Sequence, residues 1–311
     1  MQKSENKKAI DFVLSGGGPK GAGHAGFLKA VEESKVILGK GTGISIGSIV
    51  LALYVNGYRP EEICQIVRLQ FERLRDRSGK GRGRLRWPSL KEFLNGELLD
   101  MLPVFQDLCA EYKLKPQANM QIVAYDILHH RPKVFAGTDY DLAKALAASS
   151  AIPGVMRPVI EGKVKTISSW KQYLEVYERM RDSKSDSEGI YVDGFMHHPF
   201  AFDFSSKPAL ISKLGMGTEL PVSRLTQLSV QDLAFHFCEL ILARTSIISY
   251  PMPDPRDALL IETGLPSIAS VAWNLPASVH KELFDYGYKS TSKSLRTAKR
   301  NKWLRPEHLS A

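Results

Sequence analysis

The sequence predicts an α/β fold built around a mostly parallel sheet. Apolar runs, glycine-rich turns and helix-like segments alternate twice within the first sixty residues. Residues 10–14 form a strand-like run that enters the glycine turn at 15–18, and residues 36–38 form a second run before the glycine-rich segment 39–47. A helix-like apolar periodicity follows each turn. This alternation is typical of parallel sheets, which bind ligands at the carboxyl ends of their strands.

Later segments fit the same class. Residues 60–74 carry apolar side chains on one face and predict an amphipathic helix. Residues 121–128 and 133–136 predict two strands, and the alanine-rich segment 141–150 predicts a helix that stops before Pro153.

Composition limits the kind of protein. The chain has 311 residues, of which 43% are hydrophobic and 24% charged, enough for one large or two ordinary domains. Its apolar runs stop short of the ~20 residues that a membrane span needs, and its start lacks the apolar core of a signal peptide. The widely spaced Cys64, Cys109 and Cys238 exclude a disulfide framework and a cysteine-based zinc site. We expect a cytoplasmic protein, and export without a leader stays compatible with the sequence.

A candidate nucleophile lies in the second glycine turn. Gly43-Ile44-Ser45-Ile46-Gly47 is a G-x-S-x-G sequence between a predicted strand and a predicted helix. In that context the glycines permit a sharp turn that exposes the serine hydroxyl beside a helix N-terminus. Ser45 is therefore a candidate nucleophile, with Gly43 and Gly47 shaping its elbow. An ordinary glycine-rich turn is the alternative.

The first glycine turn can supply an oxyanion hole, because it presents several backbone N–H groups beside a lysine. It could equally cradle a phosphate, although it matches neither a P-loop nor a dinucleotide fingerprint. The candidate oxyanion residues are Gly16, Gly17, Gly18, Lys20 and Gly21.

A candidate base follows much later. Asp193 and Gly194 come directly after an apolar pair, at the expected end of another strand. A solvated turn aspartate is the alternative for Asp193. His197 and His198 follow at once and could complete a Ser-His-Asp triad instead.

Taken together, Gly16-Gly17-Gly18-Pro19-Lys20-Gly21, Gly43-Ile44-Ser45-Ile46-Gly47 and Asp193-Gly194 resemble the motifs of the patatin-like phospholipase family. The resemblance covers about residues 9–200 and includes the small-residue stretch 148–153 before its proline. It implies a three-layer α/β/α sandwich with a mostly parallel central sheet. It also implies hydrolysis of lipid acyl esters, as a phospholipase A or lysophospholipase, by a Ser-Asp dyad that needs no histidine. Ser45 would be the nucleophile and Asp193 the base.

Three positions depart from the family pattern. Ile44 and Ile46 replace small residues beside the serine, which predicts a narrower acyl pocket. Phe195 stands where the family has Gly or Ala after Asp-Gly, which predicts a reshaped loop or a hydrophobic wall. The chemistry requires no metal and no organic cofactor. An α/β-hydrolase-like esterase using His197 or His198 remains an alternative, as does a non-catalytic protein that binds membranes or nucleic acid.

The charge predicts an anionic partner. There are 42 Lys and Arg residues against 33 Asp and Glu, a net charge of +9. Basic residues cluster at 73–88 and 289–311, each with a tryptophan, and we expect peripheral contact with an anionic membrane. A solvated surface is the alternative, and no RRM, KH or helix-turn-helix pattern supports nucleic-acid binding. The candidate membrane-binding residues are Arg82, Arg84, Arg86 and Trp87.

The predicted organisation has three parts. A polar segment at 1–8 precedes a catalytic domain at 9–288, and a basic tail follows at 289–311. Within the domain we expect a basic loop at 73–88 and a flexible insertion at 161–189, the latter because of its polar composition. The expected substrate is a phospholipid or lysophospholipid.

Overall fold

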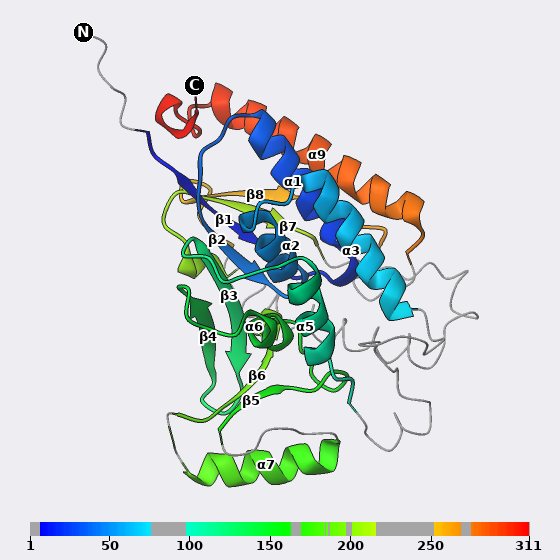
Figure 1. The fold of residues 1–311 in the computed structure, drawn as a ribbon. Coiled ribbons are helices and arrows are strands. Elements are labelled where there is room, and N and C mark those ends of the chain that lie inside the picture. Colours follow the sequence, from blue (N-terminus) through cyan, green and yellow to red (C-terminus); the bar gives the residue numbers. More distant parts are fainter. Residues whose placement is uncertain are drawn as a thin grey trace.

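A mostly parallel sheet organises the protein, as the computed structural model shows in Figure 1. The structure describes residues 7–75, 98–162, 169–183, 185, 187–196, 201–215, 252–268 and 275–310. In this part of the chain the sheet has eight strands in the order β5-β6-β3-β2-β1-β7-β8, and β4 pairs with β3. The strands are β1 (Ile10–Leu14), β2 (Leu38–Ile44), β3 (Met120–Asp126), β4 (Arg131–Ala136), β5 (Val159–Glu161), β6 (Gly189–Asp193), β7 (Ala209–Lys213) and β8 (Ala258–Glu262).

The five strands β3, β2, β1, β7 and β8 run parallel to one another, whereas β4 and β6 lie antiparallel to β3, and β5 antiparallel to β6. The predicted α/β class with a mostly parallel sheet is confirmed. The predicted strand pair around the polar turn at 129–132 is the β3–β4 hairpin.

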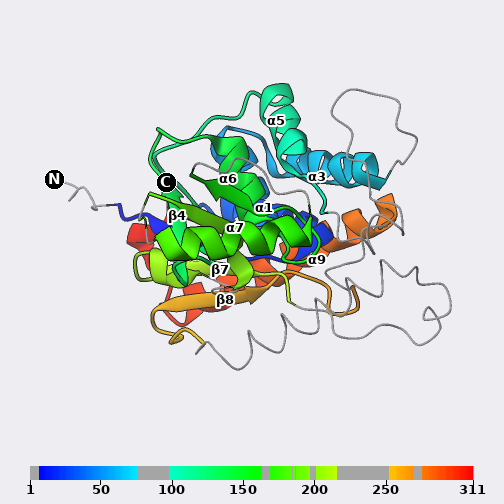
Figure 2. The ribbon, with the colours of Figure 1, turned by 90° about the horizontal axis from the view of Figure 1, so that it is seen from below.

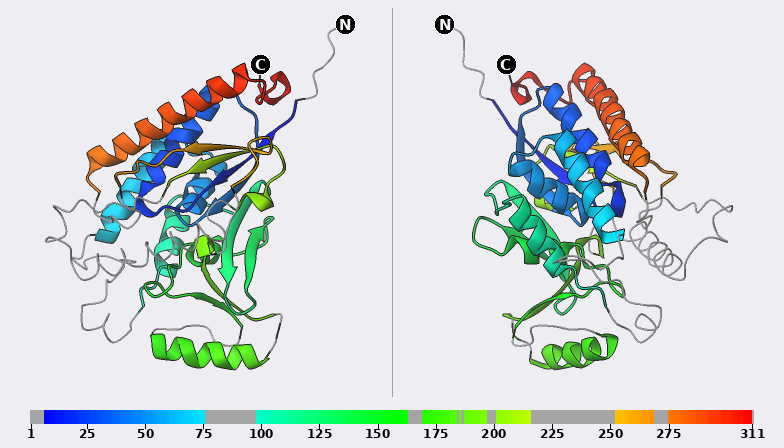
Figure 3. Two further views of the ribbon diagram at one scale, coloured as in Figure 1. Left: turned by 180° about the vertical axis from the view of Figure 1, so that it is seen from behind. Right: turned by 45° about the vertical axis from the view of Figure 1, so that its right-hand side comes forward.

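Helices cover one face of this sheet. The described helices are α1 (Ala22–Glu33), α2 (Ile46–Val55), α3 (Pro60–Arg75), α5 (Leu102–Glu111), α6 (Leu142–Ser149), α7 (Trp170–Ser183) and α9 (Ala277–Arg300). All except α7 share one hydrophobic core with Ile10, Phe12 and Leu14, which alternate along β1. Val13 points to the opposite face, where it packs with Ile211 and Ala258. Helix α7 lies beyond β5, apart from the other helices, and is in the foreground when the molecule is seen from below (Figures 2 and 3).

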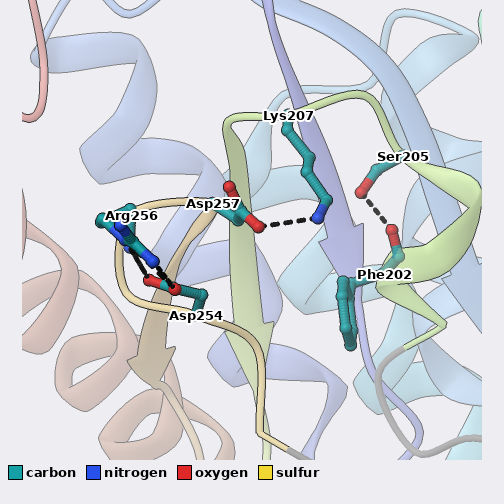
Figure 4. Close-up of polar contacts among 6 residues, drawn as sticks. All are labelled: Phe202, Ser205, Lys207, Asp254, Arg256 and Asp257. Carbon is teal, nitrogen blue, oxygen red and sulfur yellow. Dashed lines mark hydrogen bonds and ion pairs between the residues drawn. The ribbon is translucent and has the colours of Figure 1, made fainter.

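The amino ends of β7 and β8 are fastened by polar contacts between their entry loops (Figure 4). The Lys207 ammonium lies 2.7 Å from the Asp257 carboxylate, and Ala209 N–H donates to the Asp257 carbonyl at 3.0 Å. Arg256 pairs with Asp254 at 2.7 Å within the β8 entry loop. These contacts lie at the amino ends of the parallel strands, whereas the glycine turns follow the carboxyl ends of β1 and β2.

The second strand differs from its sequence-based expectation. We expected a strand at 36–38 followed by a glycine turn, but β2 runs through Gly39, Gly41 and Gly43. A Cβ atom at Gly41 would lie 2.3 Å from the Leu51 side chain of α2 and 2.7 Å from the Phe12 ring. Glycine here allows α2 to lie directly on its own strand.

Two segments expected to be flexible contain helices. Residues 161–189 include α7, whose Val176 and Met180 pack against Ile190 of β6. The expected basic tail begins inside α9, which continues to Arg300. Both helices are amphipathic, with one buried apolar face. Composition alone does not reveal such a face, because it depends on the spacing of the apolar residues.

Helix α9 shows this buried face clearly. Thr291, Leu295 and Ala298 are buried at helical spacing, whereas the intervening Lys293 and Arg296 are exposed. Residues 289–300 therefore form part of the helical layer over the sheet.

This packing predicts the effect of two substitutions one turn or less apart in α9. Leu295→Ala removes a fully buried side chain and should lower the free energy of unfolding by about 2–5 kcal/mol. Lys293→Ala alters an exposed position and should change it by less than about 0.5 kcal/mol. Urea denaturation of both variants measures the difference. Equal stability of the two would contradict the docking of this helix.

Candidate active site

Ser45 and Asp193 meet on one side of β3, because β4 pairs along its other side and β2 and β6 follow each other along this one. Ile44 of β2 pairs with Val123, and Asp193 of β6 pairs with Ala124, the next residue of β3. Ser45 directly follows Ile44. The Ser45 hydroxyl forms a hydrogen bond with the Asp193 carboxylate, so two residues that are 148 positions apart, from 45 to 193, meet in one site.

The backbone of Ser45 makes a sharp elbow between β2 and α2. Its φ of 52° and ψ of −126° lie in a region that non-glycine residues rarely adopt. Such a conformation costs on the order of 1–3 kcal/mol and persists only where its surroundings enforce it. A Cβ atom at Gly47 would lie 2.2 Å from the Leu14 carbonyl oxygen, so glycine is required for α2 to begin so close to β1. The elbow predicted from Gly43 to Gly47 is thus present in the structure.

One contact at this elbow was not predicted. Ser45 N–H donates to the Ser149 hydroxyl at 2.9 Å, and that hydroxyl donates to the Val123 carbonyl at 2.7 Å. Ser149 is the last residue of α6 and is 0% exposed. Its only signal in the sequence is its place in the small-residue stretch before Pro153, which does not say what it contacts.

Asp193 is enclosed at the end of β6, with 5% of its surface exposed. Its backbone N–H donates to the Ala151 carbonyl at 2.9 Å, and its Oδ1 accepts from Phe195 N–H at 2.9 Å. Burial raises the pKa of this carboxyl group to about 7, because removal from water disfavours the charged form. The bonds from Phe195 and Ser45 act in the opposite direction. A carboxyl group with this pKa can gain and lose a proton near neutral pH.

The glycine loop lies beside the serine. A Cβ atom at Gly16 would be 3.5 Å from the Ser45 Cβ and 2.9 Å from the Phe195 ring. Within the described residues, no acceptor takes the N–H groups of Gly16, Gly17 and Gly18. Among these residues the three donors are therefore open next to the hydroxyl, as an oxyanion hole requires.

Lys20 contributes to this loop in another way than its charge suggested. Its side chain is 0% exposed, and its ammonium donates to the Gly215 carbonyl, just beyond β7. The neighbouring Gly21 packs against Ile46, the first residue of α2. Both residues join the loop to adjacent elements.

A buried histidine, His24, bonds the residue that precedes the glycine loop. His24 Nε2 lies 2.8 Å from the Ser15 carbonyl, and Nδ1 lies 2.8 Å from the Ser212 hydroxyl. Because a carbonyl can only accept, Nε2 carries the proton and Nδ1 accepts from Ser212. Burial lowers the pKa of His24 to about 4, so the ring is neutral at physiological pH. The Ser15 hydroxyl also accepts from Leu214 N–H at 3.0 Å, which joins β1 to the chain after β7.

The three departures from the family pattern have different environments. Ile44 and Ile46 are buried, at 0% and 4% exposure, and pack in hydrophobic clusters on either side of the elbow residue in the sequence. Phe195 is half-buried in a cluster with Ile44 and Val123, and its ring lies against Gly16. Of the three, Phe195 is the one that lies beside both the base and the glycine loop.

Several candidate residues lie outside the described part of the chain. These are His197, His198, Arg82, Arg84, Arg86 and Trp87. Among the described residues, no group of His, Cys, Asp and Glu is arranged to hold a metal ion. No helix in the same part of the chain is long and apolar enough to cross a membrane.

Comparison with solved structures finds distant likeness. VipD from Legionella pneumophila is 15% identical, with a TM-score of 0.47, and the alignment covers 94% of this chain and 67% of that one. ExoU in its complex with SpcU from Pseudomonas aeruginosa is 17% identical, with a TM-score of 0.39, over 94% of this chain and 52% of that one.

Curated relatives match a short stretch at higher identity. Lysophospholipase NTE1 of Eremothecium gossypii is 47% identical over 51 residues, which are 16% of this chain and 3% of that protein. Lysophospholipase NTE1 of Yarrowia lipolytica is 43% identical over 51 residues, 16% of this chain and 4% of that protein. The match thus spans only a small part of these much longer relatives.

A family comparison covers far more of the chain. The model of the patatin-like phospholipases matches residues 12–203, more than half of the sequence. This range contains the glycine loop, Ser45 and Asp193. The chain belongs to the patatin-like phospholipase family.

Proposed function

We propose that this protein hydrolyses fatty-acyl esters of phospholipids or lysophospholipids through a Ser45 acyl-enzyme, with Asp193 as the base. The observation that carries the proposal is the hydrogen bond between the Ser45 hydroxyl and the buried Asp193 carboxylate. Membership of the family supports lipid acyl hydrolysis in general. The relatives that match over 51 residues are named lysophospholipases, which favours a lysophospholipid among the candidate substrates.

In the first half-reaction, Ser45 Oγ attacks the ester carbonyl carbon while Asp193 takes the hydroxyl proton. The carbonyl oxygen becomes an oxyanion, which the free N–H groups of the glycine loop stabilise. Collapse of this intermediate breaks the bond to the alcohol. Asp193 returns its proton to the departing alcohol, and the acyl group remains on Ser45.

In the second half-reaction, water replaces the alcohol. The water oxygen attacks the acyl carbonyl while Asp193 accepts a proton from that water. Asp193 then returns the proton to Ser45 Oγ as the fatty acid leaves. One carboxyl group therefore serves both half-reactions. Its pKa of about 7 suits this role, because a group that acts as both base and acid works best when its pKa lies near the operating pH.

The direct bond between Ser45 and Asp193 also bears on the rival mechanism. In a Ser-His-Asp triad the imidazole lies between the hydroxyl and the carboxylate. Here these two groups contact each other, which favours a dyad over a triad that uses His197 or His198. A non-catalytic binding protein would have no need of a strained serine with free N–H donors beside it.

The position of the basic residues bears on how the site would meet a bilayer. Helix α3 runs past the glycine loop, where Val67 lies close to Gly21, and ends at Arg75 on the side of the site. The predicted loop 73–88 starts there, which supports Arg82, Arg84, Arg86 and Trp87 as the membrane contact. The charges at the end of α9 lie elsewhere, because the Lys299 ammonium donates to the Ser34 carbonyl just after the end of α1 remote from the loop.

Substitution of the nucleophile tests the proposal most directly. Ser45→Ala should reduce fatty-acid release from phospholipid or lysophospholipid vesicles by at least about 10³-fold, because no acyl-enzyme can form. Mass spectrometry of the lipid products measures the loss. Ser187→Ala, at an exposed serine before β6, serves as the control and should keep wild-type activity. Fatty-acid release by the Ser45→Ala protein at the wild-type rate would refute the assignment.

The pKa of the base predicts a pH dependence. Asp193 must be ionised to accept the Ser45 proton, so kcat/KM should rise about tenfold per pH unit well below pH 7 and level off above it. The profile is measured on a neutral lipid ester between pH 5 and 9. A rate that is constant from pH 5 to 8 would exclude a base with this pKa.

The same buried carboxyl group should limit stability. Its folded-state pKa of about 7 exceeds the ordinary value of 3.8, so the folded protein holds a proton that the unfolded chain has lost between these two pH values. The fold is therefore destabilised progressively from about pH 4 to 7, and the full cost persists above pH 7.

Asp193→Asn removes that ionisation. The variant should be inactive and more stable than wild type at pH 8, by up to about 4 kcal/mol, with the difference shrinking toward pH 4. Urea denaturation at both pH values measures it. Asp182→Asn, an exposed control in α7, should change stability by less than about 0.5 kcal/mol at either pH. A loss of stability in Asp193→Asn at pH 8 would contradict the buried charge.

A further inference from the structure

The end of α6 contacts both members of the proposed dyad. At Ser149 the hydroxyl accepts the Ser45 backbone N–H at 2.9 Å. Two residues later, the Ala151 carbonyl accepts the Asp193 backbone N–H at 2.9 Å. A single short segment thus contacts both the elbow after β2 and the end of β6, which meet on the same side of β3.

We propose that Ser149 is a positioning residue, whose hydroxyl holds the Ser45 backbone in its elbow conformation and keeps Ser45 Oγ against Asp193. This inference rests on the proposed function, because it assigns Ser149 a role in orienting that nucleophile. Ser149 takes no part in bond making, since its contact is with the Ser45 backbone and not with the reacting oxygen.

The hydrogen-bond geometry uses the capacity of a hydroxyl group at both ends. Ser149 Oγ accepts from Ser45 N–H and donates its own proton to the Val123 carbonyl at 2.7 Å. Val123 is the β3 partner of Ile44, the residue before Ser45. Val123 is the last residue of β3 that pairs with β2, and Ser45 is the first residue after β2. The Ser149 hydroxyl therefore connects these two positions. Alanine at 149 would remove the acceptor of the partly buried Ser45 N–H and a donor to the buried Val123 carbonyl, which is more costly than the loss of an exposed bond.

The elbow needs a constraint of this kind. At φ 52° the Ser45 backbone is strained, and relaxation toward an ordinary conformation would swing its side chain. A second restraint on the Ser45 backbone acts at its carbonyl, which accepts Ser48 N–H at 2.9 Å and the Ser48 hydroxyl at 2.6 Å from within α2. Ser149 restrains the N-terminal side of the same residue from a different element.

The bond also determines which groups remain for the substrate. Because Ser45 N–H is bound to Ser149, it is occupied and cannot serve the oxyanion. The N–H groups of Gly16, Gly17 and Gly18, which have no acceptor among the described residues, stay available to stabilise that charge. The Ser149 contact and the glycine loop are thus complementary parts of one arrangement.

The chain supplies a matched control in the next residue. Ser150 is also buried, at 8% exposure, but its hydroxyl has no hydrogen-bond partner within the described part of the protein. Ser149→Ala and Ser150→Ala remove the same group from adjacent positions, and only the former removes a contact with Ser45. A general disturbance of the α6 end would affect both variants.

The experiment compares Ser149→Ala, Ser149→Cys and Ser150→Ala with wild type. Two readouts are measured: labelling of Ser45 by a fluorophosphonate at a series of pH values, and hydrolysis of lysophosphatidylcholine. Ser149→Ala should lower the labelling rate and kcat by about 10- to 100-fold through misplacement of the nucleophile, with KM changed less than about threefold. The midpoint of its pH profile should move upward, because the Ser45 bond that lowers the Asp193 pKa is weakened. Ser150→Ala should stay within about twofold of wild type.

The outcomes separate this proposal from the proposed function. A folded Ser149→Ala protein with wild-type labelling and an unchanged pH midpoint would overturn the inference, as would an equal loss in Ser150→Ala. If alanine prevents folding, Ser149→Cys retains the volume with a weaker donor and acceptor, and its labelling rate and pH midpoint decide in the same way. Labelling of wild-type Ser45 without lysophosphatidylcholine hydrolysis would contradict that substrate and still test Ser149.

Discussion

The hydrogen bond from the Ser45 hydroxyl to a carboxylate buried at the end of β6 is the interaction around which the site is built. A carboxylate in this position is costly, because burial disfavours its charge and raises its pKa to about 7. That cost also suits Asp193 to its proposed role as the base, since an ordinary aspartate is too weak to take a hydroxyl proton efficiently near neutral pH. The enclosure that destabilises the fold is therefore the source of the proposed reactivity.

The bond forms only if two strands and two turns hold their positions to within a fraction of an ångström. On one side, the strained Ser45 backbone is fixed through Ser149 and through the close approach of α2 to β1 at Gly47. On the other side, the Asp193 backbone is fixed to Ala151. Beneath the glycine loop, the neutral His24 ring bonds the Ser15 carbonyl and the Ser212 hydroxyl. The hydrogen bonds among these supports are buried or partly buried, and they stabilise one arrangement because each would be costly to leave unpaired.

The sequence predicted the parts of this site that depend on local spacing. Gly16 and Asp193 follow apolar runs and Ser45 lies in a G-x-S-x-G sequence, and each of these signals can be read along a single segment. Ser149 could not be found in this way, because its partner lies 104 residues earlier and an alanine-rich helix gives no sign of which hydroxyl faces a neighbour. Lys20 illustrates the same limit, since its ammonium donates to the Gly215 carbonyl beyond β7, a partner that its local sequence does not indicate. Helix α9 was missed because its polar composition outweighed the periodicity of Thr291, Leu295 and Ala298.

The net charge of +9 also needs the fold before it can be interpreted. The sequence contains two basic clusters, at 73–88 and 289–311, and the candidate membrane-binding residues were named in the first. In the structure, α9 carries its exposed charges along the outer surface of the helical layer, and its last turn lies with residues 306–309 beside the amino ends of β1 and β2 (Figure 1). The reacting groups lie at the opposite ends of these strands. A bilayer held against the end of α9 would therefore lie at the amino ends of β1 and β2, away from Ser45.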